Sequence, residues 1–264
     1  PFRVLWLGDP EILPAAGWRL NEDVAYTTTD RGMPTVLDRM TGPPPGATDV
    51  LADAVRLAGV RRTNRLGHLL GPMGVRYLVV PLRLAPADGP DLERHVPEAL
   101  TDTLAQQLDL QVVPVSDRLL VYRNTAWVPT RAVLPAPDGE RTRVADAVSE
   151  DLSGAVPALT PPAGPSDASG RVPAEGDLLV ATTSDPGWKL TIEGVPMARR
   201  EVYGWANQFD ATRTGDGHLV YDTPLARRLA TVGQALFWVV VVVVRRRSRR
   251  LERADAARWA RRST

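Results

Sequence analysis

Apolar residues in the first 135 positions form short runs of strand length, separated by a stretch with helical spacing. The run FRVLWL at 2–7 ends in a Gly-Asp-Pro turn signal, which favours a strand. At 50–57 apolar residues recur every three or four positions, which predicts a helix capped by Thr48 and ended by Gly59. Further strands are expected at 24–28, 77–82, 110–115 and 119–123, and further helices at 64–70 and 97–108. Residues 1–135 are therefore expected to form a compact α/β unit.

The pattern changes after residue 135. Between Ser153 and Gly176 there are five prolines and four glycines, with no periodicity. Residues 136–176 are therefore expected to form a linker or a long surface loop. After them, short apolar runs alternate with turn signals that are typical of tight hairpins, and about six strands in roughly 50 residues predict a small β-sandwich at 177–226.

The longest apolar run, LATVGQALFWVVVVVV at 229–244, has 16 residues and no charge. As a helix it is short for a bilayer core, which takes roughly 20 residues, but flanking arginines can reach the interfaces. The alternative is a buried strand, because valine has high strand propensity. The arginine cluster that follows favours a transmembrane helix over a buried strand. The sequence thus predicts a transmembrane helix at 227–246, a basic tail at 247–264, and an α+β fold class for the whole chain: α/β unit, β-sandwich, one C-terminal transmembrane helix.

Charge is unevenly distributed along the chain. The formal net charge is +1, yet residues 245–264 hold nine arginines and two acidic residues. By the positive-inside rule the tail is expected in the cytoplasm, beside membrane lipid, with residues 1–226 on the outer face of the cell membrane. Nucleic acid is not an expected partner, because a nucleic-acid binder spreads its basic residues over a folded face. The chain begins with Pro1 rather than Met, so we expect it to be a piece of a longer protein.

Few residues indicate catalytic chemistry. Cysteine is absent, which excludes disulfides, thiolate zinc sites and a cysteine nucleophile. The nearest approach to a metal-binding carboxylate pair is Asp9-Pro10-Glu11, which also fits a simple turn. The three histidines, His68, His95 and His218, are isolated in sequence. No phosphate-binding glycine loop or nucleophile elbow is present, so we expect no cofactor, no metal and no catalytic residue in this chain.

Aromatic residues between 188 and 209 suggest carbohydrate binding, since sugars stack their apolar faces on aromatic rings. The alternative is that Trp188 and Phe209 belong to the core of the sandwich. Trp205 lies on a turn between Gly204 and Asn207, so we expect it to be partly exposed, unlike Trp188 in an alternating strand. The candidate carbohydrate-binding residues are Tyr203, Trp205, Arg200, Asn207 and Asp210.

Three segments together resemble a known family. They are LGHLLGPMGVRYLVVP from 66 to 81, LLVYRNTAWVPTRAVL from 119 to 134, and LLVATTSDPGWKLTIEGVPMARREVYGWANQFDA from 178 to 211. Their order is similar to the C-terminal extracytoplasmic region of large polytopic bacterial membrane glycosyltransferases. These include actinobacterial proteins with a family-2 glycosyltransferase domain and the YfhO-like membrane proteins.

The resemblance implies a role in assembling cell-envelope glycans. It implies an accessory, membrane-anchoring part of such an enzyme, whose catalytic region lies in an upstream membrane domain of the same protein. The implied partners are an envelope glycan or a polyprenyl-linked sugar. The alternative is a structural or interaction ectodomain without any role in sugar chemistry.

Overall fold

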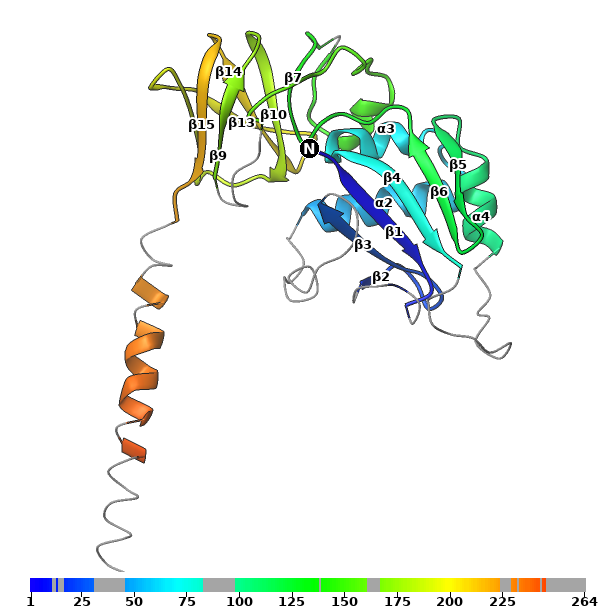
Figure 1. The fold of residues 1–264 in the computed structure, drawn as a ribbon, viewed down its shortest axis with the longest axis horizontal. Helices are drawn as coiled ribbons and strands as arrows, with labels where there is room; N and C mark the ends of the chain where they lie inside the picture. Colours follow the sequence, from blue (N-terminus) through cyan, green and yellow to red (C-terminus); the bar gives the residue numbers. More distant parts are fainter. Residues whose placement is uncertain are drawn as a thin grey trace, which may run out of the picture. The chain divides into compact units, whose positions relative to one another are not determined.

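The computed structural model describes residues 1–10, 13, 17–30, 46–82, 98–137, 139–160, 167–223, 229–231, 233–242 and 244–245. The chain divides into two units, Pro1–Tyr221 and Asp222–Thr264, and each is described by itself. The first unit contains all three sheets (Figure 1).

The first sheet has six strands and is covered on one face by helices. Its order is β2-β3-β1-β4-β6-β5, and only β1 and β4 pair in parallel. Apolar residues of β1 and β4 pack against the buried faces of the helices, as the continuous apolar run of β4 favours. The strands are β1 (Arg3–Gly8), β2 (Trp18–Arg19), β3 (Ala25–Asp30), β4 (Val75–Pro81), β5 (Leu110–Ser116) and β6 (Leu119–Asn124). The helices are α2 (Ala47–Gly59), α3 (Leu66–Leu70), the short 3-10 turn η1 (Gly71–Met73) and α4 (Glu98–Ala105).

The second and third sheets face each other across an apolar layer. Phe209, Leu190 and Ile192 lie in this layer and are almost fully buried. The second sheet has the order β13-β14-β10-β7-β8, and the third has the order β12-β11-β15-β9. The strands are β7 (Arg131–Leu134), β8 (Val156–Pro157), β9 (Asp167–Val172), β10 (Gly176–Thr183), β11 (Trp188–Ile192), β12 (Val195–Pro196), β13 (Arg199–Val202), β14 (Ala206–Ala211) and β15 (Gly215–Tyr221).

One hydrophobic cluster joins the first sheet's helices to the outer face of the second sheet. It contains Leu69 and Leu70 of α3 together with Leu179 of β10, Trp205 and Ala132 of β7. The segment at 136–176, predicted as a linker or loop, contributes β8, β9 and the 3-10 helix η3 (Val144–Val148). The α/β part and the strands after it therefore share a core.

Several predicted elements are confirmed, with small shifts in their ends. The strands expected at 2–7, 77–82, 110–115 and 119–123 correspond to β1, β4, β5 and β6. The predicted cap of α2 is wrong. The helix begins at Ala47 with Gly46 as its N-cap residue, so Thr48 lies inside the helix. No side chain caps its first turn.

The predicted fold class is wrong. Strands in three sheets dominate the fold, rather than a balance of helices and strands that ends in a membrane helix. Among the residues that the structure describes, no helix combines the length and apolar character needed to cross a bilayer. The physical reason is visible in the sequence, where only 16 uncharged residues separate arginines on both sides. The predicted tail at 247–264 lies outside the described residues.

Candidate functional site

A cavity of about 130 Å³ brings together three segments that are distant in sequence. One wall is α3, another is the loop that follows β6, and the third is the segment after η3. An aromatic ring, an imidazole and two carboxylates meet there. Its lining residues are His68, Thr125, Ala126, Trp127, Glu150, Asp151, Leu152 and Ser153.

The imidazole of His68 is oriented by Asp109. The Nδ1 atom of His68 lies 2.8 Å from Oδ2 of Asp109, and the backbone N–H of His68 donates to the same oxygen at 2.8 Å. The Asp109 side chain is 4% exposed. A carboxylate oxygen accepts hydrogen bonds, so the Nδ1–H group of His68 is the donor in this contact. Nε2 lies 3.5 Å from a guanidinium nitrogen of Arg65.

Buried amide side chains hold the beginning of α3 in place. Asn124 donates to the carbonyl oxygens of Gly67 and Val75, each at 2.9 Å, and Gln107 accepts from the backbone N–H of Leu66 at 2.9 Å. A Cβ atom at Gly67 would lie 2.7 Å from Cγ of Asp109. Glycine at this position therefore allows the close approach that brings His68 to Asp109.

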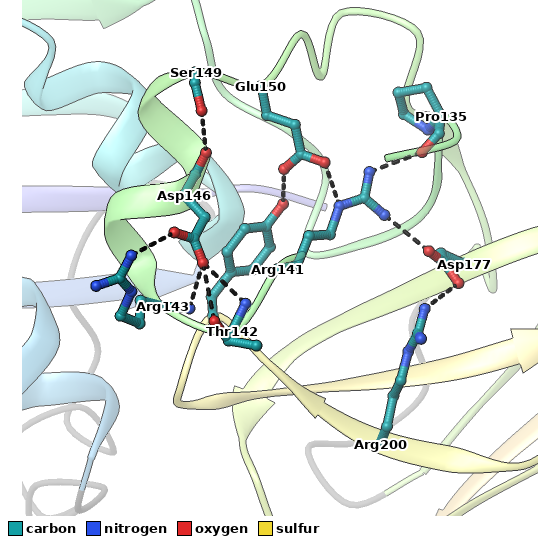
Figure 2. A network of polar contacts seen from close by, with 10 residues as sticks. Pro135, Arg141, Thr142, Arg143, Asp146, Ser149, Glu150, Asp177 and Arg200 are labelled. Carbon is teal, nitrogen blue, oxygen red and sulfur yellow. Dashed lines mark hydrogen bonds and ion pairs between the residues drawn. The ribbon is translucent and has the colours of Figure 1, made fainter. Parts of the chain in front are cut away.

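The opposite wall rests on a polar network around Arg141 (Figure 2). The Arg141 side chain is 4% exposed and binds Glu150, Oδ2 of Asp177 at 3.0 Å and the carbonyl oxygen of Pro135 at 2.7 Å. The second oxygen of Glu150 accepts from the hydroxyl of Tyr203 at 2.6 Å. Both oxygens of Glu150 are therefore engaged by protein donors, which makes this carboxylate structural rather than reactive.

Burial raises the pKa of Tyr203, and the hydrogen bond to Glu150 raises it further. The phenol therefore stays protonated and continues to donate to Glu150. On the cavity's rim, Asp151 is exposed, and the hydrogen bond from the Ser153 hydroxyl, with that from its backbone N–H, lowers the pKa of Asp151. Asp151 is thus an ionised acceptor at the cavity.

Figure 2 also shows how η3 begins beside this network. The carboxylate of Asp146 accepts from the backbone N–H groups of Arg143 at 2.7 Å and Thr142 at 3.0 Å. These bonds, chiefly the one from Arg143, lower the pKa of Asp146. They fix the segment that leads to Glu150 and Asp151.

The predicted exposure of Trp205 is wrong, because Trp205 is 2% exposed and Tyr203 is 1% exposed. Both rings pack in the main core. Tyr203 and Gly204 have φ values of 55° and 72°, and this left-handed turn directs the following residue inward rather than to solvent. Trp188, by contrast, is half-buried and packs edge-on against Tyr221 with ring centroids 5.3 Å apart.

The polar members of the predicted carbohydrate site do not converge on an open surface. Asn207 is fully buried, donates to the carbonyl oxygens of Thr182 and Thr183, and accepts from Arg199 at 2.7 Å. Arg200 binds Asp177 at 2.7 Å, and Asp210 is exposed on β14. Asn207 also accepts from the backbone N–H of Asp185 at 3.2 Å and so holds the loop before β11.

Other candidates from the sequence give no site. Glu11 and His95 lie outside the described residues, and Nδ1 of His218 lies 2.7 Å from the Ser169 hydroxyl at an exposed position. In the described part of the chain, no group of three or more acidic or histidine side chains is arranged to hold a metal ion.

A larger cavity of about 540 Å³ lies between the end of α2 and the end of α4. Most of its lining residues are exposed and polar, among them Arg61, Arg62 and Asn64. It contains no aromatic ring and no carboxylate, so we take the smaller cavity as the candidate site. No family model, curated protein or solved structure matches the chain.

Proposed function

We propose that this protein is a carbohydrate-recognition module that acts in glycan assembly, with the cavity beside α3 as its sugar site. The observation that carries the proposal is the meeting of Trp127, His68 and Asp151 at one small cavity. Sugars are recognised by an aromatic face together with a few well-placed acceptors and donors. The resemblance to envelope glycosyltransferases supplies the biological class, and an extracytoplasmic location remains a prediction from it.

Each lining residue has a definite role in this proposal. Trp127 offers apolar ring surface to one side of a sugar. The Nε2 atom of His68 accepts a hydroxyl hydrogen bond, and ionised Asp151 accepts one or two more. Thr125 and Ser153 complete the lining. A cavity of about 130 Å³ suits one terminal sugar unit rather than a long chain.

The proposal assigns binding rather than catalysis to this chain. Glycosyl transfer needs a second acid or base, or a metal ion, near the reacting carbon. Glu150, the other carboxylate at the cavity, is held by Arg141 and Tyr203. A single histidine and one exposed aspartate then fit recognition better than a reaction.

Glycan-array screening of the 264-residue chain, followed by titration calorimetry of the best ligand, tests this function. Trp127→Ala and Asp151→Asn should each weaken binding by about tenfold or more, since each removes a principal contact. Trp188→Ala and Asp210→Asn are the matched controls and should bind like wild type. Binding that depends on Asp210 and not on Asp151 would place the sugar at the site expected from the sequence instead.

The second candidate function is an interaction module with no role in sugar chemistry, and β5 is the observation that favours it. This strand is an edge of the first sheet, and its Val112 and Val115 are 65% and 63% exposed. Apolar edge strands are sites of pairing with another chain. If the 264-residue chain binds no glycan but self-associates, and Val112→Lys with Val115→Lys abolishes that association, this candidate replaces the first.

A further inference from the structure

Arg76 occupies an irregular position in β4. The pairing with β1 runs from Arg3 opposite Val75 directly to Val4 opposite Tyr77, so Arg76 is the extra residue of a bulge. Bulges redirect a side chain and are common beside binding sites. Here the bulge places the guanidinium of Arg76 near the ring of Tyr77, its own neighbour in sequence.

Three aromatic rings surround this guanidinium. Its central carbon lies 4.8 Å from the ring centroid of Trp127 and 5.4 Å from those of Phe2 and Tyr77. Phe2 packs edge-on against both other rings, with centroid distances of 5.7 Å and 6.4 Å. Cation–π attraction therefore holds the guanidinium in one place before any ligand arrives.

Among the residues that the structure describes, the Arg76 side chain has no polar partner. In the part of the chain that the structure describes, its guanidinium has neither an ion pair nor a hydrogen bond, and its Nε atom is buried. A buried donor without an acceptor is costly, and native structures keep few of them. The aromatic rings attract the positive charge but are not conventional hydrogen-bond acceptors.

A second arginine lies on the same side of the sheet. Arg123 of β6 is directly opposite Tyr77, and residues paired in this way project from the same face. Its hydrogen-bond partner is the neutral side chain of Gln111, at 2.6 Å. Arg123 therefore adds a second guanidinium on the face of the sheet that carries Tyr77, and the partner that the structure shows for it is an uncharged side chain.

We propose that Arg76 binds the phosphate group of a small organic phosphate whose apolar or ring portion packs on Phe2 and Tyr77. The planar fork of arginine matches phosphate oxygens and forms charge-assisted hydrogen bonds with them. A dianionic phosphate forms stronger charge-assisted hydrogen bonds with the guanidinium of Arg76 than a carboxylate, which carries a single charge. This site is separate from the sugar cavity, although Trp127 borders both.

Titration calorimetry of the 264-residue chain with phenyl phosphate, inorganic phosphate and benzoate at pH 8 tests the proposal. Phenyl phosphate should bind saturably and more tightly than either other probe, because only it combines a dianion with a ring. Arg76→Met should weaken binding by about tenfold or more. Arg76→Lys, which keeps the charge but not the fork, should weaken it by a smaller factor. Arg171→Met, at an exposed arginine of β9, should have no effect.

Circular dichroism shows whether each variant is folded, and if Arg76→Met is not, Arg76→Lys decides the question. Wild-type affinity in both Arg76 variants, or no saturable binding of any probe to the wild type, would overturn the proposal and leave a purely structural cation–π cluster. Tighter binding of benzoate would overturn the phosphate assignment. Asp151→Asn should leave phosphate binding intact, so failure of the sugar site and failure of this site are distinguishable.

Discussion

Asp109 accepts two hydrogen bonds from His68 through a single carboxylate oxygen, one from the backbone N–H and one from Nδ1, both at 2.8 Å. The two residues are 41 positions apart in sequence. The carboxylate therefore fixes both the beginning of α3 and the direction of the imidazole ring. The candidate sugar cavity depends on this pair for one of its walls.

Two substitutions of Asp109 distinguish the contribution of its hydrogen bonds to stability from that of its charge. Asp109→Ala leaves two donors of His68 without their acceptor in a largely buried place and should lower the free energy of unfolding by about 2–4 kcal/mol. Asp109→Asn keeps an acceptor oxygen, so its loss of unfolding free energy should be about 1 kcal/mol smaller than that of Asp109→Ala. Urea unfolding followed by circular dichroism measures both. Equal losses in the two variants would show that the carboxylate's charge, not its acceptor geometry, supports α3.

Two glycines offer a matched test of the close packing around α3. A Cβ atom at Gly67 would collide with Asp109 and Asn124, whereas one at Gly59 would meet nothing within 4 Å. Gly67→Ala should therefore destabilise the fold by about 1–3 kcal/mol. Gly59→Ala should be neutral or stabilise it by up to about 1 kcal/mol, because alanine loses less conformational entropy on folding. Thermal unfolding checks both, and a neutral Gly67→Ala would contradict the close approach.

Trp205 and Trp188 should differ in the direction opposite to that expected from their sequence context. Trp205 is 2% exposed in the main core, so Trp205→Ala should cost about 3–5 kcal/mol. Trp188 is half-buried at the beginning of β11, and Trp188→Ala should cost clearly less. Side-by-side denaturant unfolding decides the comparison. A small loss for Trp205→Ala would mean that its ring is not part of the core.

Tyr203 should make the fold sensitive to alkaline pH. Burial and Glu150 raise its pKa above the unfolded value of about 10, so above that pH the unfolded chain releases a proton that the folded chain keeps. The resulting stability is complete below about pH 10 and declines as pH rises. Tyr203→Phe should lower stability near pH 7 by about 1–2 kcal/mol, because Glu150 loses a donor.

The pH dependence distinguishes this titration from a simple packing effect. Between pH 9 and 11, the stability of Tyr203→Phe should fall less steeply than that of the wild type. Parallel curves would exclude Tyr203 as a source of the alkaline loss. Tyr26 and Tyr122, whose pKa values are raised chiefly by burial, account for part of the slope that remains.

The local helices and strands of this protein can be predicted from its sequence, because their signals lie within a few residues of each other. The apolar run of β4, the helical spacing of α2 and the turn between β5 and β6 were all readable along the chain. Gly67, Asn124 and Asn207 lie in the segments on which a family resemblance was predicted, and that resemblance stays a prediction.

How these elements pack together depends on contacts between residues that are distant in the sequence. The proline-rich segment at 136–176 contributes β8 and β9 because strands from elsewhere offer pairing partners, which composition does not reveal. Trp205 is buried because a left-handed turn meets a core made from other segments. The pairing of His68 with Asp109 and the isolation of Arg76 among aromatic rings depend on contacts between distant residues. The spacing of residues along the chain does not show such contacts. The candidate sites therefore cannot be predicted from the sequence without the packing of its strands and helices.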